Sequence, residues 1–532
     1  MSGIHPFPPN SGHNVDVNLA AAVARNAHYQ GGVTVVSYPD GDLTFAQLDD
    51  KAARLAAQFV DSGLGDGDRV AYVGLNSPAF LVTMLAAFRV GALFVPVNFR
   101  LAEPELERVL TDSGAEVVVC EEGHRAVLEN VRARTALRRF LLVDDDPNVP
   151  VGADAPEFWE LWTDVIARAE PGNTIAVKGL DDPAFLIYTS GTIGLPKGVV
   201  LTHGNVWWNS VNVDTVLDSR RGDVTYAGAP LFHIGALNSF TLRTLARGGT
   251  VVIRRGFDPE CLLDDLVTLR VNTMFAVPAM LAALARVSGA LDTPLPDLRT
   301  IVVAGAPVPA TLIEAFAAHG ITLQQAWGLT ETAPFATHLP AERTRDKVGS
   351  AGIPMPHTQV RVVGSDDNKP LKPGEPGEIV VRGPNVTPGY WRNPEATAAA
   401  FDDAGWFHSG DIGYLDEDGC LYVVDRLKDM IISGGENVYP AEVERALSAM
   451  PGITDIAVVG AADEQWGETV VAVVALAEGV AITLEDVREY GSAVLARYKL
   501  PRRLQVVPAV PRNASGKILK AEVRRLVSDD ED

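Results

Sequence analysis

Short apolar runs alternate with longer amphipathic segments near the start of the chain. Residues 69–74, 93–97 and 116–120 are short and mostly apolar, which is typical of buried strands. Residues 78–90 and 103–110 have the length and the apolar spacing of helices. This strand–helix order predicts a parallel sheet that is covered by helices on both faces.

The same alternation returns further along the chain. Strand-like and helix-like runs follow one another at residues 250–253, 259–269, 273–277, 278–287, 300–304, 309–319 and 321–326. A loop rich in glycine and hydroxyl side chains, near residue 190, separates this block from the first one. The pattern therefore predicts two α/β subdomains.

The pattern changes near Gly352. Residues 360–363 and 378–381 read as strands, and a Pro- and Gly-rich stretch separates them, so we expect a small β module there. A hairpin turn is expected at residues 416–419, and a mixed α+β pattern continues from it to the end. The expected fold class is α/β, with a large N-terminal domain of two α/β subdomains and a β module, followed by a small α+β C-terminal domain.

Composition indicates an ordinary globular protein of more than one domain. The chain has 532 residues, too many for one hydrophobic core, and it is 47% hydrophobic and 21% charged. Its 68 acidic and 45 basic residues give a net charge of −23. This charge argues against nucleic acid or an anionic membrane surface as a main partner.

The cysteines and the chain start bear on the compartment. Cys120, Cys261 and Cys420 are scattered and odd in number, which fits neither a disulfide framework nor a cysteine-based zinc site. Residues 1–10 lack the features of a secretory signal, and no apolar run has the length of a membrane span. We therefore expect a cytoplasmic protein without integral membrane association.

Residues 188–198 (YTSGTIGLPKG) carry the strongest chemical signal. Glycines let backbone N–H groups turn toward an anion, hydroxyls add donors, and Lys197 adds a mobile positive charge. Pro196 and Gly198 flank that lysine, so the segment is not the loop of P-loop kinases and ATPases. It predicts a polyphosphate cradle, and a plain Gly- and Ser-rich surface turn is the alternative.

Four further segments could complete a nucleotide site. In AWGLTE (326–331), an indole could stack on a purine and a carboxylate could hold Mg²⁺, although a tryptophan at a strand end is often core. The acid of HSGD (408–411) could accept hydrogen bonds from ribose hydroxyls or form an ordinary Asx turn. Residues 424–440 could form an interdomain hinge or a solvated charge run, and the lysine in PRNASGKILK (511–520) could reach a site or only meet solvent.

Taken together and in this order, these five segments resemble the adenylate-forming superfamily, specifically its acyl-CoA synthetases. The similarity extends from about residue 40 to residue 525, nearly the whole chain. It implies an N-terminal domain of residues 1–424 and a mobile C-terminal domain of residues 425–532, with the hinge at Asp425. It also implies ATP, Mg²⁺ and coenzyme A as the small molecules bound.

The resemblance assigns roles to individual residues of this sequence. It implies that Glu331 binds Mg²⁺, that Thr330 contacts the α-phosphate, and that Lys517 is the catalytic lysine of adenylation. His233 is implied to lie beside the carboxylate of the acid substrate. The implied β- and γ-phosphate ligands are Thr189, Ser190, Gly191, Thr192 and Lys197. The implied adenine site is formed by Trp327 and by Gly305, Ala306 and Pro307, the implied ribose ligands are Asp411 and Arg426, and the implied thiol path is lined by Gly434 and Gly435.

Two positions depart from the usual pattern of this superfamily. Ile193 stands where a threonine is usual, so the cradle has one hydroxyl fewer, and Trp327 replaces the commoner tyrosine. The first change predicts at most weaker nucleotide binding, because Thr192 and the backbone donors remain. The second keeps an aromatic face for stacking.

The implied reaction has two steps. The carboxylate of the substrate attacks the α-phosphorus of ATP and expels pyrophosphate, and the thiol of coenzyme A then displaces AMP from the acyl-AMP. Trp207, Trp208, Phe232, Leu237 and Phe240 lie where the acyl pocket of this superfamily is built, so a medium- to long-chain fatty acid is the first expectation and an aryl acid the second. An acyl carrier protein is the alternative acceptor, and the sequence leaves the oligomeric state open, a homodimer included.

Other activities on the same scaffold are less well supported. Domains that activate α-amino acids carry an aspartate where this chain has His233, which argues against that substrate class. No residue favours a luciferase-type oxygenase, and the presence of both Glu331 and Lys517 argues against a regulator that only binds nucleotide.

Overall fold

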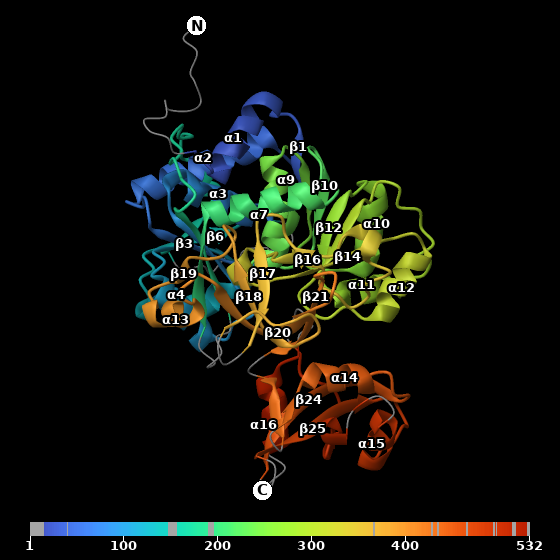
Figure 1. The fold of residues 1–532 in the computed structure, drawn as a ribbon. Coiled ribbons are helices and arrows are strands. Elements are labelled where there is room, and N and C mark those ends of the chain that lie inside the picture. The colour runs from blue at the N-terminus through green and yellow to red at the C-terminus, as the bar shows by residue number, and fades with distance from the viewer. Residues whose placement is uncertain are drawn as a thin grey trace.

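The computed structural model describes most of the chain: residues 15–39, 41–146, 157–189, 196–364, 368–426, 429–433, 436–463, 467–492, 495, 497–512 and 518–528. Two large sheets, a small antiparallel sheet and a separate C-terminal lobe can be followed in Figure 1. The predicted α/β class, with a large N-terminal and a small C-terminal domain, is confirmed.

The first large sheet has the strand order β19-β9-β8-β4-β3-β5-β6-β7. Strands β3 to β8 of this sheet run parallel, whereas β9 and β19 are antiparallel to their neighbours. The strands are β3 (Arg69–Val73), β4 (Leu93–Val97), β5 (Val117–Glu121), β6 (Arg139–Val143), β7 (Trp159–Leu161), β8 (Pro183–Thr189), β9 (Lys197–Thr202) and β19 (Gly389–Tyr390).

The second large sheet has the order β16-β15-β14-β13-β12-β10-β11-β1-β2. Its central strands from β14 to β1 are parallel. The strands are β1 (Thr34–Ser37), β2 (Leu43–Thr44), β10 (Val224–Ala227), β11 (Thr250–Ile253), β12 (Thr273–Ala276), β13 (Thr300–Val303), β14 (Leu323–Trp327), β15 (Thr337–His338) and β16 (Ile353–Pro354). Because β1 pairs with β11, the start of the chain belongs to the second sheet, a crossing that the strand–helix pattern does not predict.

Helices cover both sheets. In the N-terminal part they are α1 (Leu19–Gln30), α2 (Phe45–Asp61), α3 (Pro78–Val90), α4 (Glu103–Ser113), α5 (Arg125–Val131), α6 (Trp162–Ala167), α7 (His203–Val216), α8 (Ile234–Ala236), α9 (Leu242–Ala246), α10 (Pro259–Thr268), α11 (Pro278–Leu284), α12 (Ala310–Ala318) and α13 (Pro394–Ala400). None of the helices in the described part of the chain is both long and apolar enough to cross a bilayer.

Local sequence explains where the buried helix α3 begins and ends. The Ser77 hydroxyl accepts a hydrogen bond from the Phe80 N–H, Pro78 occupies the first turn, and Gly91 ends the helix with a φ of 83°. These are a standard N-cap, a proline whose missing N–H costs nothing there, and a left-handed C-cap that favours glycine. The helix is therefore set by its own ends as well as by its burial.

The predicted β module is a four-stranded antiparallel sheet of β17 (Gln359–Val363), β18 (Gly377–Arg382), β20 (Phe407–Leu415) and β21 (Leu421–Arg426). Beyond it, the C-terminal lobe contains β22 (Ile431–Ser433), β23 (Glu436–Val438), β24 (Ile453–Asp463), β25 (Gly467–Leu476), β26 (Arg503–Val506), α14 (Pro440–Leu447), α15 (Leu484–Ser492) and α16 (Lys520–Ser528). Figure 1 shows this lobe set apart from the rest of the molecule. The boundary between residues 424 and 425 remains a prediction.

A buried ionic group joins the two large sheets. Arg255, just after β11, donates to Glu121 at the end of β5 (Nη2–Oε2, 2.7 Å) and to Asp146 (Nη1–Oδ2, 2.8 Å). Glu121 is 1% exposed, and it also accepts hydrogen bonds from the Tyr72 hydroxyl (3.1 Å) and the Leu75 N–H (3.2 Å). A buried carboxylate needs such partners, so this group fixes how the carboxyl ends of β5 and β11 meet.

Replacing Arg255 by methionine should strongly destabilise the protein, because Glu121 would stay buried without its cation. We expect the free energy of unfolding to fall by about 3–5 kcal/mol, measured by urea denaturation. Arg270→Met is the matched control, since it breaks an exposed pair with Asp297 (2.9 Å) and should leave the unfolding midpoint unchanged. Equal effects of the two substitutions would show that the buried pair does not hold the sheets together.

Candidate active site

The predicted phosphate loop lies at the end of a β-hairpin. Thr189 ends β8 and Lys197 begins β9, and the two residues are paired across the ladder. Ser190, Gly191 and Thr192, which were predicted to bind phosphate, and Ile193 lie outside the described residues. The described ends of the loop are therefore held opposite each other by strand pairing.

Tyr390 brings Lys197 and Glu331 together. The Lys197 Nζ lies 5.1 Å from the centroid of the Tyr390 ring, and the Tyr390 hydroxyl donates to Glu331 Oε1 over 3.0 Å. Burial, and then the nearby Glu331 carboxylate, raise the pKa of Tyr390, so the phenol is the donor. The fold thus places the predicted phosphate-binding lysine and the predicted Mg²⁺ ligand on one side chain.

Glu331 lies in a tightly constrained turn. Thr330, Glu331 and Thr332 form a single turn of 3₁₀ helix, which Ala333 ends with a left-handed φ of 58°. A side chain at Gly328 is excluded, since a Cβ there would lie 1.8 Å from the Pro334 carbonyl oxygen. The backbone conformation, rather than side-chain packing alone, therefore sets the positions of Thr330 and Glu331.

Two buried asparagines hold the same turn through hydrogen bonds to its backbone. Asn238 donates to the Ala333 carbonyl (2.6 Å), and Asn385 donates to the carbonyls of Thr332 (2.8 Å) and Phe335 (3.0 Å). Both side chains are fully buried, so their hydrogen bonds are expensive to lose. No local sequence pattern points to these two asparagines, because nothing in the sequence links residues 238 and 385 to this turn.

A hydrogen bond joins the side chains of Trp327 and Asp411. The indole Nε1 donates to Asp411 Oδ2 over 2.9 Å, and the two residues are 9% and 5% exposed. Trp327 also packs in the apolar cluster of the β module with Ala336 and Val381, as a core residue does. The structure thus links the predicted adenine and ribose residues, while stacking on a purine stays a prediction.

The other predicted nucleotide residues lie near this pair. Gly305 follows β13 with a φ of 88°, which favours glycine, and it precedes Ala306 and Pro307 at the carboxyl end of that strand. Because β13 pairs with β14, this loop lies beside the strand that ends at Trp327. On the other side, Arg426 is the ladder partner of Asp411 across β20 and β21.

His233 lies at the N-cap of α8, in a segment that the other sheet positions. Asn76, which follows β3, accepts a hydrogen bond from the Leu231 N–H (2.8 Å) and donates to the Ala229 carbonyl (2.8 Å). The His233 ring contacts the Phe232 ring at 4.3 Å between centroids. His233 is exposed by surface area, and partial removal of water by the surrounding protein, followed by the positive charge of Arg100, lowers the pKa of its imidazole to about 4.

Four of the five predicted acyl-pocket residues fall into two groups, and the fifth, Phe232, lies beside His233. Leu237 and Phe240 lie in a turn of π-helix, and Phe240 belongs to a buried apolar cluster that includes Val302 of β13 and the following Ala304. Trp207 is 40% exposed, and Trp208 contacts the ring of His357 with 5.0 Å between centroids. Trp207 is therefore exposed, Trp208 lies beside His357, and neither residue belongs to the apolar cluster that contains Phe240.

The predicted C-terminal site residues Lys517, Gly434 and Gly435 lie outside the described residues. In the part that is described, Asp425 of β21 accepts a hydrogen bond from the Ala441 N–H in α14 (2.7 Å). The predicted hinge residue thus contacts both the β module, through its strand, and the C-terminal lobe.

The described residues fit a metal that is shared with a ligand. Among them, no three His, Cys, Asp or Glu side chains form a cluster that could hold a metal alone. Glu331 offers a carboxylate beside Lys197, and Mg²⁺ commonly takes one or two carboxylates together with substrate phosphates and water. A site of this kind suits Mg²⁺ bound with ATP.

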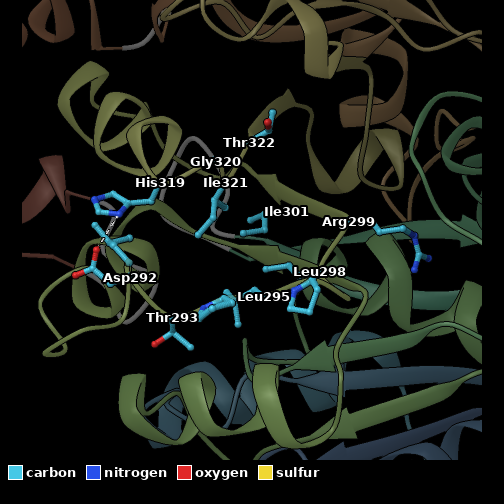
Figure 2. A pocket seen from close by; sticks show the side chains of 13 residues that line it. Asp292, Thr293, Leu295, Leu298, Arg299, Ile301, His319, Gly320, Ile321 and Thr322 are labelled. Carbon is cyan, nitrogen blue, oxygen red and sulfur yellow. Dashed lines mark ion pairs between the residues drawn. The ribbon is translucent and has the colours of Figure 1, made fainter.

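A cavity of about 480 Å³ lies elsewhere, at the amino ends of β13 and β14 (Figure 2). Its wall includes Leu295, Leu298 and Ile301, with His319 and Asp292 at one side. None of the predicted site residues lines it. It is therefore separate from the chemistry described above.

Comparison with known proteins agrees with this geometry. Residues 23–391 match the AMP-binding enzyme family, and residues 442–517 match the AMP-binding enzyme C-terminal domain. The chain is 44% identical to a feruloyl-CoA synthase of Amycolatopsis sp over 95% of its length and 98% of that protein. It is 39% identical to an indoleacetate–CoA ligase of Aromatoleum aromaticum (96% and 98% covered) and 38% identical to a long-chain-fatty-acid–CoA ligase of Mycobacterium tuberculosis (92% and 94% covered).

Solved structures support the same comparison. The crystal structure of ATP-bound MatB from Rhodopseudomonas palustris is 31% identical and superposes with a TM-score of 0.87, over 97% of this chain and 100% of that one. The apo form of the same protein superposes with a TM-score of 0.75 over the same shares. The whole chain therefore superposes better on the ATP-bound form than on the apo form.

The lowered pKa of His233 predicts that its imidazole is neutral at pH 7 and takes up a proton only near pH 4. Because this pKa lies below the value of 6.5 for a free histidine, the unfolded chain protonates first. The stability linked to neutral His233 is then complete above pH 6.5 and is lost as the pH falls toward 4. An NMR titration of ¹³C-labelled histidines, with the signal assigned by His233→Asn, checks this, and a midpoint near 6.5 would contradict it.

Proposed function

The chain belongs to the AMP-binding enzyme family and is an AMP-forming acid–thiol ligase of the acyl-CoA synthetase type, and we propose that it converts an aromatic carboxylic acid into its CoA thioester. The reaction uses ATP and Mg²⁺ and passes through an acyl-AMP. We place it in the cytoplasm, where its three scattered cysteines would stay reduced.

The observation that carries the proposal is the convergence of Lys197 and Glu331 on Tyr390. A lysine at the mouth of a Gly-rich hairpin and a carboxylate in a rigid turn are what a Mg²⁺–polyphosphate complex requires. The Asp411–Trp327 pair adds a polar acceptor for a ribose beside this site. These groups come from distant parts of the sequence, so their meeting is a property of the fold.

In the first step, these residues position the reactants. Lys197 and the hairpin backbone hold the β- and γ-phosphates, Thr330 lies beside the α-phosphate, and Lys517 stabilises the charge that develops there. A bound Mg²⁺ supplies positive charge to the phosphate oxygens, and Glu331 is the residue that would hold it. Neutral His233 can donate an N–H to the substrate carboxylate without adding a competing charge.

In the second step, the thiol of coenzyme A attacks the acyl carbon. The new carbon–sulfur bond replaces the bond from the acyl carbon to the phosphate oxygen, AMP leaves, and the thiol gives up its proton. We propose that the C-terminal domain turns about Asp425 between the steps, so that the Gly434–Gly435 segment replaces Lys517 at the site.

Two observations favour an aromatic acid. The relatives at 44% and 39% identity are named for feruloyl and indoleacetate substrates. In this chain, a Cβ at Gly235 would lie only 2.9 Å from the Phe275 ring, so that ring presses on α8 close to His233. We propose that this ring forms one wall of the acid site, where a flat aromatic substrate could stack against it.

A fatty acid is the second candidate. The relative at 38% identity is named for long-chain fatty acids, and Phe240 belongs to an apolar cluster next to the site. A panel of aryl, arylalkyl and fatty acids separates the two, with ATP-dependent pyrophosphate release as the measurement. We expect kcat/KM for the best aryl acid to exceed that for the best fatty acid by at least about tenfold, and the reverse order would transfer the proposal to fatty acids.

The same panel tests the acceptor. Mass spectrometry of the products should show the CoA thioester when coenzyme A is present. An acyl carrier protein that carries phosphopantetheine is the second acceptor to supply. Faster transfer to the carrier than to coenzyme A would favour a ligase that loads carrier proteins, and no acyl-AMP with any acid would end the proposal.

Replacing Lys517 by alanine should lower acyl-AMP formation by about 10²- to 10³-fold, since one preorganised positive donor is lost. Thioester formation from supplied acyl-AMP and coenzyme A should remain close to wild type, because Lys517 acts only in the first step. The two half-reactions are measured separately, by pyrophosphate release and by CoA thioester yield. Near-normal pyrophosphate release would show that another group stabilises the first step.

A further inference from the structure

We propose that Tyr390 is a positioning residue that aligns the metal-binding and the phosphate-binding side chains as one unit. Its hydroxyl orients the Glu331 carboxylate, and its ring face supports the Lys197 ammonium. This inference rests on the roles proposed above for Glu331 and Lys197. Tyr390 itself has no role in those steps, and its motif was not among the segments that the sequence singled out.

The contacts of Tyr390 are specific at both ends of the side chain. The hydroxyl lies 3.0 Å from Glu331 Oε1, and the Thr387 N–H donates to the Glu331 carbonyl at 2.7 Å. The same short segment therefore holds both the side chain and the backbone of Glu331. The Lys197 Nζ, 5.1 Å from the ring centroid, is within the range of a cation–π contact.

The backbone that carries Tyr390 is fixed by its neighbours. In β19, Gly389 pairs with Val200 and Tyr390 pairs with Val199, so the segment is joined to the strand that begins at Lys197. The Tyr390 N–H donates to the Thr397 hydroxyl (3.0 Å). Gly389 accepts no side chain, because a Cβ there would lie 2.4 Å from Thr397 Cγ2. The phenol therefore starts from a rigid base.

The next residue fastens the segment from the other side. The Trp391 N–H donates to the Gly198 carbonyl (2.8 Å), and its indole Nε1 donates to the Asp112 carbonyl (3.2 Å). β19 is thus hydrogen-bonded to the residues that follow Lys197, and the Lys197 side chain lies over the Tyr390 ring. One phenol therefore contacts both Glu331 and Lys197.

The hydrogen bond from Tyr390 matters because Glu331 would bind the metal together with groups of the ligand. A glutamate side chain has several rotamers, and each would place the carboxylate differently. A hydrogen bond from a rigid donor selects one orientation, as partners of metal ligands commonly do. We therefore expect Tyr390 to influence the metal dependence of nucleotide binding more than nucleotide binding itself.

The test compares Tyr390→Phe with a matched control, Tyr188→Phe. Tyr188 lies in β8, just before the predicted phosphate ligands, on the hairpin to which β19 is paired. Its hydroxyl also donates to a carboxylate, Asp112 Oδ2 in α4, over 2.7 Å. Each variant therefore loses one phenol–carboxylate hydrogen bond next to the phosphate loop. Circular dichroism and the melting temperature establish that both variants are folded.

Tyr390→Phe should raise the Mg²⁺ concentration needed for half-maximal pyrophosphate release by about 10- to 100-fold, the usual effect of losing a partner of a metal ligand. ATP binding measured by calorimetry in EDTA should change by less than about twofold, because the ring under Lys197 remains. Tyr188→Phe should leave the Mg²⁺ midpoint at the wild-type value. Tyr390→Leu, which removes the ring as well, should also weaken ATP binding in EDTA, by about threefold to tenfold.

A wild-type Mg²⁺ midpoint in Tyr390→Phe would overturn the inference, and so would an equal shift in Tyr188→Phe, since that would indicate general support of the hairpin. Either result leaves the proposed ligase activity intact, because that activity is judged on acyl-AMP and thioester formation by the wild-type protein. Failure of the wild type to form acyl-AMP would instead remove the proposed function. Calorimetry with Mg²⁺ and with EDTA would still report whether Tyr390 affects metal-dependent ATP binding.

Discussion

The site depends on one constraint. In each of the two large sheets the parallel strands end at the site, and buried polar groups hold these carboxyl ends together. Arg255 from one sheet is fixed by Glu121 and Asp146 from the other, with hydrogen bonds of 2.7 and 2.8 Å. Charges this deeply buried tolerate little movement, because each displacement would leave an ion without its partner. The joint therefore sets the distance between the two halves of the N-terminal domain. The residues at the strand ends are positioned by this distance.

The side of the site that is predicted to bind the acid shows how the joint between the sheets positions other residues. Asn76 follows a strand of the first sheet, yet its amide is bonded to Ala229 and Leu231 in the segment that leads to His233. The position of His233 is thus determined by both sheets. The nucleotide side is built differently, with rigid turns around Gly328 and the Tyr390 segment, and Asn238 and Asn385 brace it from below. One half of the site follows from the joint between the sheets, and the other follows from local backbone geometry.

The sequence predicts those features that are encoded locally. Buried parallel strands are continuous apolar runs, so the alternation of strands and helices is readable, and short motifs predict roles for Lys197, Glu331 and Asp411. The pairing of β1 with β11 and the contacts of Tyr390 are not predicted, because they join segments far apart in the chain, and no local pattern records such a partner. Trp327 shows that a local motif can also leave out part of a residue's role. Its motif predicts a ligand contact, and the structure in addition places it in the core, where it donates to Asp411.

Asp425 illustrates how a static structure constrains a motion. Its backbone belongs to the ladder with Ile412 in the β module, while its carboxylate accepts the Ala441 N–H at the start of α14, over 2.7 Å. A carboxylate at a helix N-terminus is favourable, so the residue binds the C-terminal lobe as well as the N-terminal domain. If the lobe turns about this residue, the ladder and the side-chain bond cannot both keep their present geometry. Losing a single hydrogen bond to a charged group costs about 1.5–3 kcal/mol, which bound nucleotide or coenzyme A can offset. The arrangement seen here, closer to an ATP-bound relative than to its apo form, is then the one in which the Asp425–Ala441 bond is made.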